Sequence, residues 1–124
     1  MGYDGKGQFV LNSQDSLPEL GSEQWILEKF CPFDSEISVM VARSKTGEIA
    51  AYEPLTNIHK NGILDESHYP AKIPEGLKIK AQNLARNIAE KIDLIGVLAV
   101  EMFVIGNELL VNELAPRPHN SGHF

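Results

Sequence analysis

The stretch from Ile95 to Leu114 constrains the fold of this chain more than any other. A mostly apolar run, Ile95 to Ile105, is followed by Gly106-Asn107 and by a second β-rich run, Leu109 to Leu114. Two such runs on either side of a short turn with glycine and asparagine are typical of a β-hairpin. No apolar run approaches the roughly 20 residues of a membrane-spanning helix. We therefore expect this hairpin to belong to the core of a globular domain.

A helix is predicted before this hairpin. Between Glu75 and Ile92 apolar residues recur at the spacing of one helical face, and Gly96 lies just beyond the end of the pattern. Further upstream, a β-rich run from Glu36 to Arg43 is followed by Lys45-Thr46-Gly47 and a second run from Glu48 to Tyr52, which predicts another hairpin. Strands, one helix and a final hairpin predict an α+β domain built on an antiparallel sheet.

Weaker patterns occupy the rest of the chain. Phe9 to Leu11 and Gln24 to Phe30 are predicted to be short strands, and the polar segment 57–69 is predicted to run across the surface or over a cleft. With 124 residues, the chain has room for one small domain with one core.

Charge and cysteine content exclude several classes of protein. The formal net charge is −6 and the basic residues are scattered, which argues against nucleic acid as a partner. Cys31 is the only cysteine, so neither an internal disulfide nor a zinc cluster of several cysteines can form. The N-terminal residues lack the hydrophobic segment of a signal peptide. We therefore expect a cytoplasmic protein without a membrane partner.

Two glutamates in the C-terminal hairpin suggest a metal site. Glu101 lies inside the first apolar run, where an unpartnered carboxylate is costly to bury, and Glu113 lies in the second run. Carboxylates on neighbouring strands are suited to hold a hard cation such as Mg²⁺. A two-residue turn would place Glu101 opposite Asn112, whereas a three-residue loop, Gly106 to Glu108, would place it opposite Glu113. The metal hypothesis predicts the longer loop; the alternative is that one glutamate faces solvent.

Glycines are concentrated in residues 2–8. They allow successive backbone N–H groups to converge on a phosphate, and Lys6 adds a positive charge. The spacing matches neither the Walker loop nor the Gly-x-Gly-x-x-Gly fingerprint. A flexible terminal loop is the alternative.

Residues 112–123 gather polar side chains in one short segment. Those that can donate hydrogen bonds to an anionic substrate are Arg117, His119, Asn120, Ser121 and His123. The spacing of His119 and His123 is that of a helical zinc pair, but Pro118 and Gly122 disfavour a helix there. A frayed polar tail is the alternative.

The end of the predicted strand 24–30 is a candidate contact for an adenine, and Glu36 is a candidate for ribose hydroxyls. Ordinary charges at strand ends are the alternative for both, and His59 is ambiguous in the same way.

Together and in this order, these segments resemble the ATP-grasp superfamily. Within it they are similar to the N5-carboxyaminoimidazole ribonucleotide synthases, the ATPase subunits of phosphoribosylaminoimidazole carboxylase. The resemblance is carried by residues 2–8, 28–30, 36–39, 57–64, 96–103 and 112–123. It covers essentially the whole chain, and residues 112–123 are its most specific part. The resemblance implies an ATP-grasp fold in which residues 1–124 form a partial domain with a C-terminal metal-binding hairpin.

The resemblance also implies a role for each segment. The loop that closes over the ATP phosphates would consist of Gly2, Tyr3, Asp4, Gly5, Lys6, Gly7 and Gln8. Glu28, Lys29, Phe30 and Cys31 would line the adenine pocket. Glu36 would bind the ribose, with His59 near the nucleotide. Mg²⁺ would be held by Glu101 and Glu113, helped by Asn112. The residues that face bicarbonate, carboxyphosphate and the ribonucleotide would be Arg117, His119, Asn120 and Ser121. The first three of these would be catalytic, together with Lys6 at the phosphates.

The reaction implied by the resemblance is the ATP-dependent carboxylation of 5-aminoimidazole ribonucleotide with bicarbonate through carboxyphosphate, in purine biosynthesis. Such phosphoryl transfer depends on positioning and charge neutralisation, which agrees with the lack of a convincing nucleophile–base pair. The family usually dimerises. It also has an N-terminal domain that helps to bind the ribonucleotide and a C-terminal region. Neither has a counterpart in this sequence, so we expect a fragment.

Three alternative interpretations remain. The first is another ATP-grasp ligase with a different acceptor, such as the formate-dependent glycinamide ribonucleotide transformylase, which the segment 117–123 disfavours. The second is a non-catalytic nucleotide-binding module. The third is a structural α+β domain with solvated glutamates, which a separation of more than about 8 Å between Glu101 and Glu113 would support.

Overall fold

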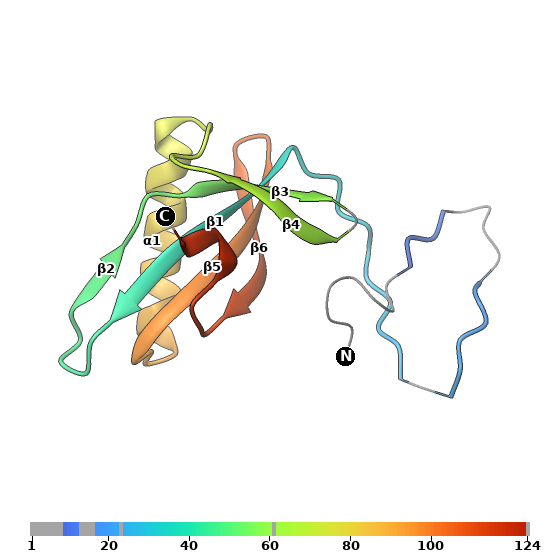
Figure 1. The fold of residues 1–124 in the computed structure, drawn as a ribbon, viewed down its shortest axis with the longest axis horizontal. Coiled ribbons are helices and arrows are strands. Elements are labelled where there is room, and N and C mark those ends of the chain that lie inside the picture. The colour runs from blue at the N-terminus through green and yellow to red at the C-terminus, as the bar shows by residue number, and fades with distance from the viewer. Residues whose placement is uncertain (1–8, 13–16, 23, 61, 124) are drawn as a thin grey trace.

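The computed structural model describes residues 9–12, 17–22, 24–60 and 62–123. Figure 1 shows a twisted sheet with a helix behind it and an N-terminal segment that extends away from the sheet. The strands are β1 (Ser35–Arg43), β2 (Ile49–Ala51), β3 (Leu55–Lys60), β4 (Ile63–His68), β5 (Gly96–Ile105) and β6 (Glu108–Ala115). The helices are α1 (Glu75–Lys91) and a short 3₁₀ turn, η1 (Asn120–Gly122).

The sheet is antiparallel throughout, as the sequence predicts. Its strand order is β4-β3-β1-β5-β6, and β2 pairs with the same edge of β1 as β3 does. The two predicted hairpins are both present, as β1–β2 and β5–β6. β1 and β5 pair along their full lengths at the centre of the sheet.

The core lies between the sheet and α1. Alternate residues of the two central strands form one cluster with the helix, as expected from the two-residue period of a strand. Ala81, Ala85 and Ala89 are fully buried on the helix. Because alanine side chains are small, the helix packs closely against the branched residues of β1 and β5.

The helix ends where the apolar pattern ends, but Gly96 is not the residue that terminates it. Its last residue is Lys91, and Asp93 takes the left-handed conformation with φ of 49°. The N–H groups of Asp93 and Leu94 donate to the carbonyls of Glu90 and Ala89, which satisfies the last turn. Gly96 instead begins β5 with φ of 115°.

The other face of the sheet is polar. Glu36 and Ser38 alternate with the core residues of β1, and Ser38 is the register partner of Glu101 on β5. Figure 1 shows η1 on this side, opposite α1. A Cβ added to Gly122 would lie 3.0 Å from Sδ of Met40, so η1 rests directly on the sheet. Glu36, Glu101 and η1 therefore share one face of the sheet.

Two predicted segments differ from the structure. Phe9 to Leu11 and Gln24 to Phe30 form no strand; Ile26 and Leu27 of the second are 87% and 88% exposed. These apolar residues are not paired with a strand. An apolar run predicts a strand, but it does not show whether a neighbouring strand is present to pair with it. Conversely, the polar segment 57–69 contributes most of the β3–β4 hairpin. Its strands lie at the sheet edge with most side chains exposed, so they lack the apolar alternation of a buried strand.

Within the described part of the chain, no helix is long and apolar enough to cross a membrane.

Candidate functional site

Glu101 and Glu113 are direct partners across the β5–β6 hairpin. The longer loop predicted for this pairing is wrong, because Ile105 pairs with Glu108 and the turn has two residues, Gly106 and Asn107. The register instead shifts between Glu101 and Met102, which leaves Asn112 as an extra residue in β6. A β-bulge of this kind re-aims side chains next to functional sites. The bulge thus achieves the pairing that a longer loop would have given.

The side chain of Glu101 is only 15% exposed, and its carboxylate contacts His119. His119 Nε2 lies 2.9 Å from Glu101 Oε1. Burial raises the pKa of Glu101, and the negative charge of Glu113 raises that pKa further. A bound divalent cation would relieve the unfavourable ionisation of Glu101 in this environment.

The donor set fits Mg²⁺ in its chemistry. Directly opposite residues of an antiparallel pair have Cβ atoms about 4.5–5.5 Å apart, so one cation can reach both carboxylates. Mg²⁺ prefers oxygen ligands and is commonly held by one or two carboxylates together with substrate phosphates. Across the residues that the structure describes, no group of three or more His, Cys, Asp or Glu side chains could hold a metal ion. The hairpin places two glutamates opposite each other, and Asn112 at the bulge is exposed beside them.

The C-terminal segment folds back over the sheet and is not a frayed tail. The side chain of His119 is 11% exposed, and Ser121 is 2% exposed. Ser121 Oγ lies 2.9 Å from Ser38 Oγ and 2.8 Å from His119 Nδ1. Arg117 and Asn120 remain exposed at either side of this anchor, and Arg117 Nη1 donates to the carbonyl of Pro118 at 3.2 Å.

His119 acts as a neutral hydrogen-bond donor at this site. Burial lowers the pKa of His119, and the nearby Arg117 guanidinium lowers it further. At neutral pH its contact with Glu101 is therefore a hydrogen bond from an uncharged imidazole. This contact also argues against a zinc pair, because both ring nitrogens of His119 are already engaged, while His123 is exposed.

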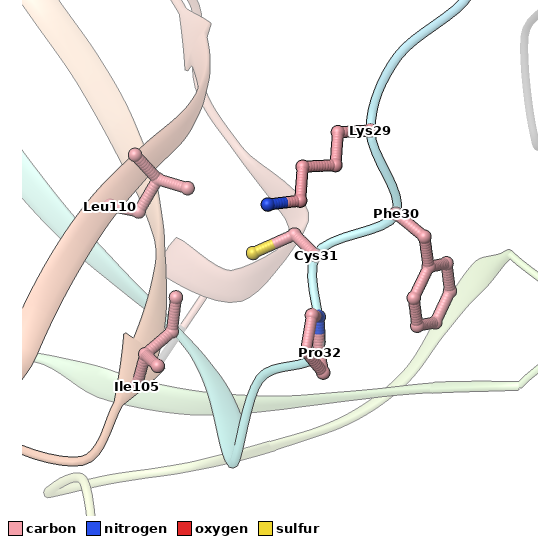
Figure 2. A pocket seen from close by; sticks show the side chains of 6 residues that line it. All are labelled: Lys29, Phe30, Cys31, Pro32, Ile105 and Leu110. Carbon is pink, nitrogen blue, oxygen red and sulfur yellow. The ribbon is translucent and has the colours of Figure 1, made fainter.

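A shallow hollow of about 370 Å³ lies between the N-terminal segment and the β5–β6 hairpin. It is lined by Lys29, Phe30, Cys31, Pro32, Ile105 and Leu110. Figure 2 shows Lys29 and Cys31 directed toward the hairpin, whereas the ring of Phe30 turns to the other side. Three of the four residues predicted around adenine thus line one hollow. Glu28 is exposed and is not among the lining residues.

A second hollow of about 260 Å³ lies over the β1–β3 edge of the polar face. Glu36 and His59 both line it, and His59 Nδ1 forms a contact with Glu36 Oε2. Glu36, predicted at the ribose, and His59, predicted near the nucleotide, are therefore together. Phe33 also lines this hollow and stacks on Phe103 at a centroid distance of 4.4 Å.

The glycine loop 2–8, with Lys6, lies outside the described residues. Its predicted contact with phosphates stays a prediction.

Several residues of the site were not predicted from the sequence. Ile105 and Leu110 line the first hollow although each reads as an ordinary apolar strand residue. Ser38, Asn57 and Ser67 form hydrogen bonds beneath η1. A signal for Ser38 was present, since a serine inside Ile-Ser-Val-Met-Val is a polar residue in a buried strand.

Comparisons with known proteins agree with this geometry. The model of the ATP-grasp domain family matches residues 1–124. The N5-carboxyaminoimidazole ribonucleotide synthase of Bacillus subtilis is 48% identical over 128 residues, an alignment that covers 99% of this chain and 34% of that protein. This chain thus spans about a third of the length of that relative.

Solved structures give the same result. The carboxyaminoimidazole ribonucleotide synthase of Aspergillus clavatus, complexed with ATP, superposes with a TM-score of 0.90 at 36% identity, over 99% of this chain and 34% of that one. The Aspergillus clavatus enzyme in complex with ADP and 5-aminoimidazole ribonucleotide gives a TM-score of 0.73 at 33% identity, over 77% of this chain and 26% of that one. The match of the family model over residues 1–124 shows that this chain belongs to the ATP-grasp domain family.

Proposed function

We propose that this chain carries the nucleotide- and magnesium-binding part of an ATP-dependent ligase that carboxylates 5-aminoimidazole ribonucleotide. The observation that supports it most is the cross-strand pair Glu101–Glu113, joined by a hydrogen bond to His119 of the C-terminal segment. A cation site and an anion-facing segment are thereby adjacent, as a reaction between ATP and bicarbonate requires.

ATP would lie along the polar face, with its adenine in the hollow that Lys29, Cys31 and Leu110 line. The hollow is mostly apolar, which suits a base. Glu36 would accept hydrogen bonds from ribose hydroxyls. The glycine loop with Lys6 would cover the phosphates.

Glu101 and Glu113 would hold Mg²⁺, with Asn112 as a neighbouring oxygen donor. When bound, Mg²⁺ would neutralise charge on the ATP phosphates. The carboxylates fix where that charge is neutralised, and the Glu101–His119 hydrogen bond restricts the orientation of one of them.

The proposed chemistry is phosphoryl transfer followed by carboxylation. A bicarbonate oxygen attacks the γ-phosphorus of ATP, the bond to the β-phosphate oxygen breaks, and ADP and carboxyphosphate form. The C–O bond of carboxyphosphate to its phosphoryl group then breaks, which gives CO₂ and inorganic phosphate. The amine of 5-aminoimidazole ribonucleotide attacks the carbon of CO₂ and loses a proton to give the carbamate. Arg117, His119 and Asn120 would orient bicarbonate and stabilise the transferring group by hydrogen bonds and charge.

The choice of acceptor rests on the relatives. The Bacillus subtilis protein is named for this reaction, and one Aspergillus clavatus complex contains ADP and 5-aminoimidazole ribonucleotide. The homodimer and the cytoplasmic location expected from the resemblance remain part of the proposal, as does the assignment of residues 1–124 to a partial domain.

Isotope incorporation tests the proposed reaction. The chain would be incubated with Mg²⁺, ATP, ¹⁴C-bicarbonate and 5-aminoimidazole ribonucleotide, and both ADP and the labelled carbamate would be measured. We expect ADP release that depends on both substrates, and its loss in Arg117→Ala. ADP release that depends on formate and glycinamide ribonucleotide would assign a different ligase. Tight Mg·ATP binding without turnover for either acceptor would contradict catalysis by this chain.

A further inference from the structure

A row of hydrogen-bonded polar groups, buried from Asn57 onward, crosses the sheet beneath η1. It begins at β4, where the Ser67 hydroxyl donates to Asn57 Oδ1 at 3.0 Å. Asn57 Nδ2 then donates to Ser38 Oγ at 3.0 Å, and Ser38 Oγ lies 2.9 Å from Ser121 Oγ. Ser38 is 0% exposed, Asn57 is 5% exposed and Ser121 is 2% exposed. Buried groups of this kind are retained when their hydrogen bonds are complete.

The row continues into the candidate metal site. Ser121 Oγ lies 2.8 Å from His119 Nδ1, and His119 Nε2 lies 2.9 Å from Glu101 Oε1. An unbroken series of hydrogen bonds therefore joins the edge hairpin β3–β4 to the glutamate in the centre of the sheet.

Chemistry fixes the direction of every bond in this series. An amide NH₂ only donates, so Ser38 Oγ accepts from Asn57. Ser38 gives its own hydrogen to Ser121 because Ser121 uses its hydroxyl hydrogen at His119 Nδ1, which is an acceptor of the Ser121 backbone N–H. Ser121 Oγ then accepts from Ser38 and donates to His119 Nδ1. The backbone N–H of Ser121, which also only donates, points at the same Nδ1 at 3.3 Å. Nδ1 is thus an acceptor from two sides.

An imidazole that accepts at Nδ1 carries its hydrogen on Nε2. His119 Nε2–H is then the donor to Glu101 Oε1, and Oε2 of Glu101 is left without this partner. The hydroxyls and the amide thus select both the tautomer of His119 and the oxygen of Glu101 that remains available.

We propose that Ser38 and Asn57 are positioning residues for the cation site: through Ser121 they hold His119 as an Nε2–H donor, which orients Glu101 with one oxygen free for Mg²⁺. The inference rests on the proposed function for the cation, whereas the hydrogen-bond series rests on geometry alone. Partners that orient a metal-binding side chain typically change metal affinity about 10- to 100-fold when they are removed.

Nitrogen NMR of the histidine rings tests the series directly. Long-range ¹H–¹⁵N spectra of the ¹⁵N-labelled chain distinguish Nε2–H from Nδ1–H imidazole, and comparison with His119→Gln assigns the signals of His119. We expect the unliganded chain at neutral pH to show the Nε2–H pattern for His119. An Nδ1–H pattern in the wild-type chain would overturn the proposal without any variant.

Asn57→Asp reverses the series with almost no change of shape. A carboxylate only accepts, so Ser38 would turn its hydrogen toward position 57 and Ser121 would lose its donor. We expect the unmixed Nε2–H pattern to disappear in this variant. Asn83→Asp, the same substitution at an exposed helix position, serves as the control and should keep the pattern. Ser38→Ala interrupts the series without adding charge and should give the same loss as Asn57→Asp.

Calorimetric titration with Mg·ADP tests the positioning role of the hydrogen-bond series separately from the proposed function. Asn57→Asp should lower Mg·ADP affinity about tenfold although its added negative charge alone would attract the cation. A changed tautomer with unchanged affinity would overturn the positioning role. Absence of Mg·ADP binding by the wild-type chain, with the tautomer pattern as expected, would instead contradict the proposed function.

Discussion

Glu101 is the residue on which most of this site depends. It lies in a strand whose neighbouring positions are core, yet it is held by a hydrogen bond from His119 and faces Glu113. Burial is the largest cause of the raised pKa of Glu101, and the negative charge of Glu113 is the second largest. Without a cation, the folded environment therefore makes ionisation of Glu101 less favourable than it is in water.

This arrangement predicts that Glu101→Gln stabilises the metal-free chain at neutral pH. A carboxyl whose folded pKa is raised contributes stability that is fully present below the unfolded pKa and is lost as pH rises through the folded pKa. Glutamine keeps an oxygen acceptor for His119 Nε2–H but carries no charge. Thermal unfolding followed by circular dichroism should show a higher Tm for Glu101→Gln at pH 7, and a smaller difference from wild type near pH 4.

Glu108→Gln, at an exposed position of the same hairpin, is the matched control and should change Tm little. A lower Tm for Glu101→Gln at pH 7 would show that the charge of Glu101 stabilises the chain even without a cation, against this account.

The β5–β6 hairpin is the element that creates the site. Its two-residue turn places Gly106 at φ of 56°, and the Gly106 N–H donates to Asp34 Oδ2 at 2.7 Å. Beyond the turn the pairing is regular until the bulge, which sets Glu113 opposite Glu101. Turn and bulge together determine the register of the carboxylates.

Two glycine substitutions test whether the conformation of the turn, and not the loss of a glycine as such, determines stability. Gly106→Ala forces an L-residue into the left-handed region and should lower the free energy of unfolding by about 1–2 kcal/mol. Gly76→Ala, in the first turn of α1 with open space around its Cα, should raise that free energy by about 0.5 kcal/mol. Urea denaturation measures both, and equal effects of the two substitutions would contradict the role of the turn.

At this scale, sequence reasoning succeeded where burial leaves a periodic pattern. The helix around Ala81 and Ala85 and the hairpin around Glu101 were predictable because one face of each is packed in the core. The β3–β4 hairpin was missed because an exposed edge strand carries little apolar alternation. The pairing of Glu101 with Glu113 was predicted, but it was attributed to a longer loop, whereas a β-bulge produces it. A bulge leaves no signature in residue types, so pattern analysis selects the loop length instead.

The site as a whole is assembled from parts that are distant in the sequence. The first hollow lies between residues 29–32 and the β5–β6 hairpin, and the C-terminal segment returns over β1 through Ser121 and Ser38. Ile105 and Leu110 could not be assigned to the hollow from sequence, because their role depends on where the irregular segment before β1 lies against the sheet. The glycine loop is assigned by resemblance alone.

This assembly predicts that Leu110 contributes to nucleotide affinity. Leu110→Ala removes an apolar wall of the hollow and should weaken Mg·ADP binding about fivefold, the equivalent of about 1 kcal/mol. Ile95→Ala, at an exposed apolar position outside the hollow, should leave the affinity unchanged. Fluorescence anisotropy with a labelled ADP measures both variants, and equal affinities for Leu110→Ala and wild type would place the base elsewhere.

Calorimetric titration of the chain with ADP, in the presence and absence of Mg²⁺, tests the central claim that Glu101 and Glu113 form a cation site for a bound nucleotide. Glu113→Gln removes one ligand, and Glu108→Gln neutralises an exposed glutamate of the same strand as the control. We predict binding that requires Mg²⁺, is lost in Glu113→Gln and is retained in Glu108→Gln. Mg²⁺-dependent binding of equal strength in Glu113→Gln and wild type would contradict the assignment of the paired glutamates.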